Sequence, residues 1–526
     1  SLTRNWGGDD GISAMTDDKP KPTPTTTTPQ SAQAQLSRRK KVEMLDTTCT
    51  VLEMMFRKVI VKADHWKELV SLLVYVSRYC SIYRQQAADA GVDGGGSNGD
   101  GGGEYGPEGS VAVKKSIELF RLFSRVPSAR ITMAGTPGLL EVLVGVINST
   151  DGSSAFSKVS AIWTLAYLAG STDNMATMGK VPGLVDTLLN AADPDSGILS
   201  ALLTGKLSEN AREQAARAAM ILTSCEHNQA YYLEEDTVIN ILQKLLKDEN
   251  GSIRGYSAAC FRNISSVTNN VPKIVAFKET LIVKFLLETT NDPNDLVCQY
   301  AVEALKSLAP EIAAQELDIT TNILERMSQI ANSQRSIDVK ICASAALRTL
   351  ADVITASNPK FHACLLTALV TAARTDDDTR VYVNIAQALH KQATFVANRP
   401  AMITTELFTC LAAISSSDDP SVITSITQLL QSLSLEGGTN REALASVGLS
   451  TTLTNLVTST VVEARDDSLR LIKRLAPTNS FRTAARKQKH FMTALMDLSI
   501  REGDEAIRAK VRDVIVLLLM PVTPEV

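Results

Sequence analysis

The chain has 526 residues, of which 44% are hydrophobic and only 5% aromatic, and its formal net charge is −4. Such a nearly balanced charge argues against attraction of the whole chain to nucleic acid or to an anionic membrane surface. The longest strongly apolar run near an end, residues 514–520, is far shorter than the about 20 residues that a membrane-spanning helix needs.

Residues 1–36 are rich in Thr, Pro, Gly and Gln. They carry too few apolar side chains to offset the entropy lost on folding, which predicts a disordered tail. Residues 37–90 have apolar side chains at helical spacing and predict N-terminal helices that cap the domain after them. Residues 91–110 contain two Gly-Gly-Gly triplets and predict a flexible loop. A phosphate-binding loop is excluded because no Lys-Ser or Lys-Thr pair directly follows a spaced glycine.

From residue 111 to residue 526 the pattern predicts helix after helix, with an internal repeat. A nine-residue segment recurs eight times, for example as AIWTLAYLA in 161–169 and SAACFRNIS in 257–265. We call the seventh residue of each segment the register position, which falls at Tyr167, Ile221, Asn263, Ser307, Thr349, Lys391, Ser432 and Arg474. Neighbouring positions are 41 to 44 residues apart, except for a first interval of 54 that predicts an insertion at about 191–210.

An apolar stripe accompanies the register position. The residue two before it is apolar in every repeat, and the residue one after it is apolar in every repeat except at Gln392. These offsets lie on one side of an α-helix, so the stripe is predicted to be buried. Since no single unit can cover this stripe, the units are expected to stack on one another.

Each Ala-rich segment follows another apolar helix, such as the one that begins Pro182-Gly183-Leu184-Val185. This helix, an Ala-rich helix that ends Phe-Arg-Asn-Ile-Ser, and a spacing of about 42 residues together resemble the armadillo repeat, a close relative of the HEAT repeat. The resemblance implies an all-α, right-handed superhelical α-solenoid over residues 111–526, whose third helices line a concave, protein-binding groove. Trp163 with Tyr167 and a lone Asn263 replace the repeated Trp and Asn of importin alpha, which argues against recognition of basic import signals.

The predicted groove carries a ladder of cations. The residue before the register position is Arg262, Lys306, Arg348, His390 or Lys473 in five of the repeats, and Glu303 is the one acid found on this face. Stacked repeats align equivalent positions, so an extended acidic or phosphorylated segment of a partner is the expected ligand. The predicted groove residues are Trp163, Tyr167, Arg262, Asn263, Lys306, Arg348, His390, Lys391, Arg470, Lys473 and Arg474.

Other interpretations stay open at this point. The cations equally fit an ordinary solvated helix face, because Lys and Arg are good helix formers. The leading function is a non-enzymatic scaffold or adaptor, and the alternative is a chaperone-like or transport receptor that binds clients transiently. A phosphate or nucleic-acid ligand is less favoured, because the predicted groove has few aromatic side chains for base stacking.

No pattern of residues predicts an enzyme. None of the five histidines pairs with another at helical spacing, and neither HExxH nor Gly-x-Ser-x-Gly occurs, so no metal and no cofactor are expected. The eight cysteines are scattered without a CxxC pair, which predicts reduced thiols and a cytoplasmic protein. The basic run at residues 38–41 leaves a nuclear location open.

Overall fold

A computed structural model describes residues 47, 50, 67–75, 107–149, 155–199, 205–234, 236–354, 358–373, 378–435, 438–446 and 448–521. These residues form helices and connecting turns and contain no strand, which confirms the predicted all-α fold. Most of the predicted tail, N-terminal helices and glycine-rich loop lie outside the described residues. Helix α3 (Pro107–Ser124) begins with a proline, four residues before the predicted start of the repeats.

The chain divides into two compact units, one of residues 1–60 with 76–115 and one of residues 61–75 with 116–526. In the first unit, the Lys115 Nζ donates a hydrogen bond to the Thr50 Oγ1 over 2.8 Å. In the second unit, residues 67–75 are helical and bury Val70 and Leu73. The rest of the second unit contains the repeats.

The second unit is built mostly of three-helix repeats. The first four repeats are α4 (Pro127–Ala134), α5 (Leu139–Asn148) and α6 (Ala155–Ala169); α7 (Thr172–Gly179), α8 (Leu184–Ala192) and α9 (Lys206–Thr223); α10 (Glu226–Glu234), α11 (Asp236–Leu245) and α12 (Gly251–Ser265); and α13 (Val271–Ala276), α14 (Leu281–Thr289) and α15 (Asp295–Ala314). The last three are α20 (Arg399–Met402), α21 (Thr405–Ile414) and α22 (Pro420–Ser434); α23 (Gly438–Ser446), α24 (Ser450–Val457) and α25 (Val462–Leu475); and α26 (Asn479–Lys487), α27 (Lys489–Arg501) and α28 (Glu505–Leu519).

Between these two groups, two repeats have two described α-helices each. They are α16 (Ile319–Ala331) with α17 (Ile337–Ala351), and α18 (Pro359–Ala372) with α19 (Thr379–Thr394). In the first case α15 continues through Pro310 to Ala314, where other repeats start a separate short helix. Short 3₁₀ helices η2 (Pro194–Ser196), η3 (Thr268–Asn270) and η4 (Val396–Asn398) lie in connecting segments.

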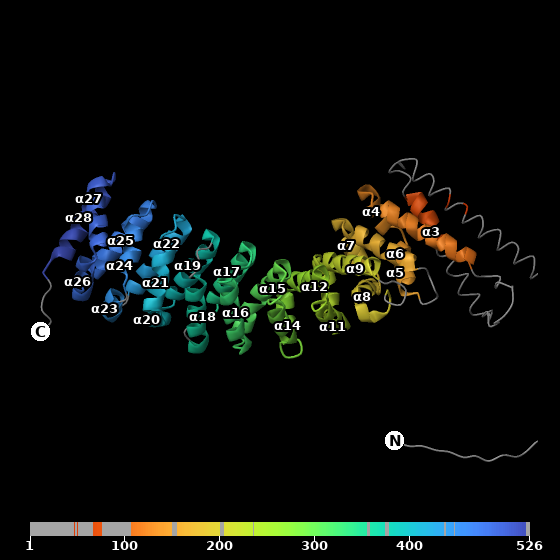
Figure 1. Ribbon diagram of the computed structural model, residues 1–526, viewed down its shortest axis with the longest axis horizontal. Coiled ribbons are helices and arrows are strands. Elements are labelled where there is room, and N and C mark those ends of the chain that lie inside the picture. The colour runs from red at the N-terminus through yellow and green to blue at the C-terminus, as the bar shows by residue number, and fades with distance from the viewer. Residues whose placement is uncertain are drawn as a thin grey trace, which may run out of the picture. The chain divides into compact units, whose positions relative to one another are not determined.

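We call the last helix of each repeat its third helix, even where only two are described. It carries the register position in every repeat except the last, α26 to α28. Each third helix packs against the third helix of the next repeat, in the order α6, α9, α12, α15, α17, α19, α22, α25 and α28. Figure 1 shows these helices following one another in chain order. The tandem repetition predicted from the sequence is therefore present in the described residues.

The predicted apolar stripe forms the core of this array. The residues two before and one after the register position are buried at all eight register positions. Gln392, the polar exception, is also fully buried, because its Nε2 donates hydrogen bonds to the carbonyls of Ala351 (2.7 Å) and Ile354 (2.9 Å). A polar side chain is tolerated there because its donor is satisfied.

Turn residues set where the helices begin. Gly138 and Gly183, with φ of 84° and 70°, precede α5 and α8 in the left-handed conformation that glycine adopts at least cost. Asn250 precedes α12, and its side chain accepts hydrogen bonds from the backbone N–H groups of Ser252 and Ile253. The Asn250 cap fixes the start of α12 and so the register of its exposed side chains.

The insertion predicted at about 191–210 holds no additional α-helix in its described part. It contains the end of α8, η2, and the first residues of α9, which begins at Lys206. Residues 200–204 lie outside the description. Among the described residues, no single helix is long and apolar enough to cross a membrane. The helices α4 and α5 reach the required length and apolarity only when taken together, and they meet at a bend of 88°.

Candidate functional site

The candidate site is the surface that we call the third-helix face. It consists of the register positions and the residues one and four before them on α6 through α25. Arg348 on α17 and Lys473 on α25 are exposed, while Arg262, Lys306 and His390 are half-buried. The predicted cations therefore lie on the accessible side of third helices, and those of α12, α15, α17 and α19 belong to helices that pack consecutively.

Aromatic side chains occupy the first part of this face. The rings of Trp163 and Tyr167 on α6 are 5.6 Å apart and tilted by 39°. The Arg130 guanidinium lies 5.8 Å from the centre of the Tyr167 ring. Phe156, on the same helix, is 56% exposed. The predicted pair is thus formed, and it offers an aromatic surface next to a cation.

Arg262 is held by several neighbours. Its Nη1 lies 3.6 Å from the Glu303 carboxylate, and its guanidinium stacks on the Tyr300 ring at 4.6 Å. Its Nη2 also donates a hydrogen bond to the Asn263 Oδ1 over 2.8 Å. Asn263 is buried, so the predicted Asn263 orients Arg262 rather than facing a ligand. Tyr300, one helical turn before Glu303, is a neighbour of Arg262 that was not predicted from the sequence.

Asn263 itself links two neighbouring third helices. Its Nδ2 donates hydrogen bonds to the Thr223 Oγ1 (2.9 Å) and to the Met220 carbonyl (3.3 Å) of α9. Because both amide donors are used within the protein, Asn263 has little left to offer a partner. Its role in the site is to position Arg262.

The cations at the end of the face are paired with acids. Arg470 lies 2.6 Å from Asp466 and 3.4 Å from Asp467 on the same helix, and Lys473 lies 3.8 Å from Asp513. Glu303 is the one acid at the positions that define the face, and these aspartates lie outside those positions. Residues three and four positions apart share a side of an α-helix, so Asp466 and Asp467 reach Arg470 from the preceding turn.

The remaining predicted residues are also engaged. The Arg474 Nη1 donates a hydrogen bond to the Ser434 Oγ over 2.9 Å, and the Lys391 Nζ lies 3.8 Å from Asp352. Burial, together with the nearby Lys391 charge, lowers the pKa of His390. His390 is therefore a neutral side chain at pH 7 rather than a cation of the ladder.

Four cations of the face have no acidic partner within ion-pair distance among the described residues. They are Arg217, Lys306, Arg348 and Arg474, and Arg474 is engaged with Ser434. The Arg348 Nη1 donates one hydrogen bond, to the Gln387 Oε1 over 2.7 Å, which leaves most of its donors available. The neutral Gln428, Gln431 and Ser432 of α22 follow in chain order. Of these four cations, only Lys306 and Arg348 lie on third helices that pack directly against each other, α15 and α17, and we call this pair the centre of the accessible positive charge.

A thiol close to this centre is not a nucleophile. The Cys342 Sγ of α17 lies 3.5 Å from the Glu303 Oε1. Burial, and then the Glu303 charge, raise the pKa of Cys342 to about 12. Since the thiolate is the reactive form, Cys342 stays protonated and unreactive at neutral pH. The six described cysteines are all free thiols.

A second periodic feature, a row of buried asparagines, was not predicted. Each side chain donates a hydrogen bond to the group six residues before it, at or near the end of a third helix, over 2.8 to 3.1 Å. The row consists of Asn174, Asn228, Asn270 and Asn398. Each of these asparagines lies six residues after the buried position that follows the register position. This constant spacing is the signal by which the row could have been predicted from the sequence. These asparagines cap helix ends and face no ligand.

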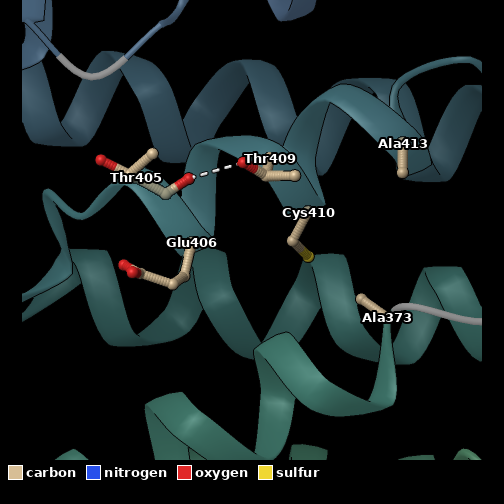
Figure 2. A pocket seen from close by; sticks show the side chains of 6 residues that line it. All are labelled: Ala373, Thr405, Glu406, Thr409, Cys410 and Ala413. Carbon is tan, nitrogen blue, oxygen red and sulfur yellow. Dashed lines mark hydrogen bonds between the residues drawn. The ribbon is translucent and has the colours of Figure 1, made fainter.

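Two hollows lie away from the third-helix face. One, of about 380 Å³, is lined by Ala373, which follows α18, and by residues of α21 that include Glu406 and Cys410; Figure 2 shows these side chains. The other, about 950 Å³, lies among α14, α16 and α18 and mixes acids with Lys284, Arg326 and Lys360. In the described part of the chain, no three His, Cys, Asp or Glu side chains group as metal ligands. Neither hollow forms a recognisable catalytic site.

Comparison with known proteins identifies relatives in structure only. No known protein family and no curated protein matches the sequence. The crystal structure of an engineered protein superposes with a TM-score of 0.52 at 19% identity, over 78% of this chain and 95% of that protein. A second engineered protein covers 44% of this chain and 96% of its own, with a TM-score of 0.36 at 18% identity. At such low identity, the first likeness shows the fold alone.

Proposed function

We propose that the tandem array is a right-handed superhelix of the armadillo type and that the third-helix face is its concave groove. The three-helix repeats and the spacing of 41 to 44 residues support the armadillo assignment. The pairs α16 with α17 and α18 with α19 resemble the two-helix HEAT arrangement in the middle of the array. A groove of this type suits an extended ligand that touches several repeats.

We further propose that the protein is a non-enzymatic scaffold or adaptor that binds an extended acidic segment of a partner protein. One observation carries this proposal. Arg262, Lys306 and Arg348 occupy the same position of α12, α15 and α17, which are third helices that pack consecutively. A chain of carboxylates that crosses these helices meets a cation on each of them.

The three cations differ in what they offer the ligand. Lys306 and Arg348 have no carboxylate partner to give up in the described structure, so they are the primary contacts. Arg262 exchanges its 3.6 Å contact with Glu303 for a carboxylate of the partner. Its stacking on Tyr300 leaves the edge of the guanidinium available for such a pair. Trp163 and Tyr167 hold an apolar residue at the other end of the segment.

Charge reversal tests this proposal. The double variant Arg262→Glu with Arg348→Glu is compared with Arg125→Glu, which reverses an exposed charge outside the third-helix face. The probe is a labelled synthetic peptide of alternating Glu and Pro, and the readout is fluorescence anisotropy. We expect the double variant to lose binding and Arg125→Glu to retain it, because only the former opposes the ligand with like charges. Unchanged binding by the double variant removes the proposal.

The ligand class is tested with two further probes. A phosphorylated peptide of the same length distinguishes phosphate from carboxylate recognition, since arginine pairs with both. A single-stranded oligonucleotide tests the nucleic-acid alternative. If the oligonucleotide binds more tightly than both peptides, with an affinity that falls steeply as salt rises, the protein-scaffold proposal is wrong.

A further inference from the structure

The last two described helices expose a cluster of apolar side chains. Ile500 and Met496 on α27 are 74% and 47% exposed, and Val516 and Leu519 on α28 are 58% and 56% exposed. Met520 follows directly at 44%. Elsewhere in the described residues, only the helix of residues 67–75 exposes two large apolar side chains, and every other helix exposes at most one. Single exposed apolar residues are ordinary, whereas such a cluster marks an interaction surface.

Comparison with the preceding repeat shows what kind of surface this is. Aligning buried residues places Met496 of α27 where α24 has Val457, which is fully buried. In the same way Leu519 of α28 corresponds to Ala476, which directly follows α25 and is 1% exposed. The preceding repeat buries these positions by packing α24 on α27 and α25 on α28. The final described repeat thus presents repeat-packing positions with large apolar side chains.

A repeat that only terminates an array presents polar side chains at these positions, since its outer face meets water. The final described repeat does not have a polar side chain there: at the position equivalent to Ala476 it has Leu519, which is larger and more apolar. Together with Arg508, Arg512 and Ile515, Leu519 lies on one stripe of α28 at the spacing i, i+4, i+7 and i+11. This stripe has the dimensions and periodicity that a facing helix requires.

The charges around this stripe select the partner. Between Asn479 and Met520 there are eight Lys or Arg and five Asp or Glu residues, in a chain whose net charge is −4. Glu505 pairs with Arg508 and Arg512 at once, over 2.5 Å and 3.5 Å, so one acid is shared by two cations. Lys487, Lys489 and Arg501 are exposed on the neighbouring helices. A second copy of the chain would bring the same positive charge against this face, whereas an acidic partner complements it.

We propose that the stripe of α28 and the adjacent Met496 and Ile500 of α27 form a docking site for an acidic amphipathic helix of another protein. The apolar side of that helix covers Leu519, Ile515 and Met496, and its flanking carboxylates pair with Arg508 and Arg512. This surface is separate from the third-helix positions that carry Arg262 and Arg348, and the two sites bind different ligands.

The experiment uses the full chain and two synthetic helical peptides. Both peptides carry leucines at i, i+3, i+4 and i+7, and they differ only in flanking Glu or flanking Lys. By fluorescence anisotropy, we expect the Glu-flanked peptide to bind at least about tenfold more tightly than the Lys-flanked one. We expect Leu519→Glu, which introduces a charge into the stripe, to weaken that binding by at least about tenfold.

Three controls keep the result interpretable. Ile131→Glu alters a residue on α4 that is 53% exposed, and binding should be unchanged. The Arg262→Glu, Arg348→Glu variant should also bind the helical peptide normally, because its changes lie on the other surface. Circular dichroism verifies that Leu519→Glu remains folded, as expected for a substitution at an exposed position.

Three outcomes overturn the proposal. They are equal affinity for both peptides, binding of neither peptide, and binding that Leu519→Glu leaves intact. Light scattering supplies a fourth: a dimer that Leu519→Glu converts to a monomer assigns the face to a second copy of the chain.

Discussion

The buried asparagine row leads to a sharp stability prediction at Asn228. This residue is 5% exposed, and its Nδ2 donates hydrogen bonds to the carbonyls of Leu222 and Met175, each over 3.0 Å. The substitution Asn228→Ala removes both bonds and leaves the two carbonyls less well satisfied. At ~1 kcal/mol for each bond, we expect a local destabilisation of about 2 kcal/mol.

Hydrogen exchange is the appropriate assay, because repeat arrays open in parts rather than in one transition. A loss of about 2 kcal/mol corresponds to roughly thirtyfold faster exchange. We expect this change in the amides of α9 and α10, where Asn228 caps the end of one helix and lies in the other. The matched control is His227→Ala at the exposed neighbouring position. Equal exchange in the two variants would refute the capping argument.

Two further substitutions change titratable groups and lead to three predictions. In Glu303→Gln, loss of the carboxylate lowers the pKa of the Cys342 thiol, so alkylation of Cys342 at pH 9 should become faster than in the wild type. The same variant frees Arg262, so affinity for the acidic peptide should rise by up to about fivefold, as expected for a partly exposed pair. Weaker binding would contradict the proposal that Glu303 and the ligand carboxylate compete for Arg262. Burial lowers the pKa of His362, so the unfolded state binds more protons, and stability that is fully present above pH 6.5 should fall as pH drops below it. Chemical denaturation of His362→Leu between pH 7 and pH 5 should show a smaller loss than the wild type, and an equal loss would show that other groups are responsible.

The all-α class, the repeat spacing and the buried stripe followed from the sequence, because each depends on the local periodicity of a helix. Leu165, Leu305 and Leu389 were predicted to be buried from their offsets alone, and they are fully buried. The same reasoning placed Arg262, Lys306 and Arg348 on the accessible side of their helices. These are properties that a few turns of helix decide.

Contacts between repeats could not be predicted from helical periodicity. The pairing of Arg262 with Glu303 and of Lys473 with Asp513 joins residues about 40 positions apart, and each depends on how two helices pack. The same is true of the hydrogen bonds of Asn228. The exposure of Leu519 likewise depends on which neighbour packs against α28, and a helical pattern cannot specify that.

The sequence by itself therefore determined a tandem array of helices and the side of each third helix that faces solvent, because helical periodicity acts within a single element. Only the tertiary structure decided which cations remain unpaired and which apolar positions remain uncovered. The physical reason is that neutralisation of a charge and burial of an apolar surface both require a second element at contact distance. For this chain, that second element lies one whole repeat away.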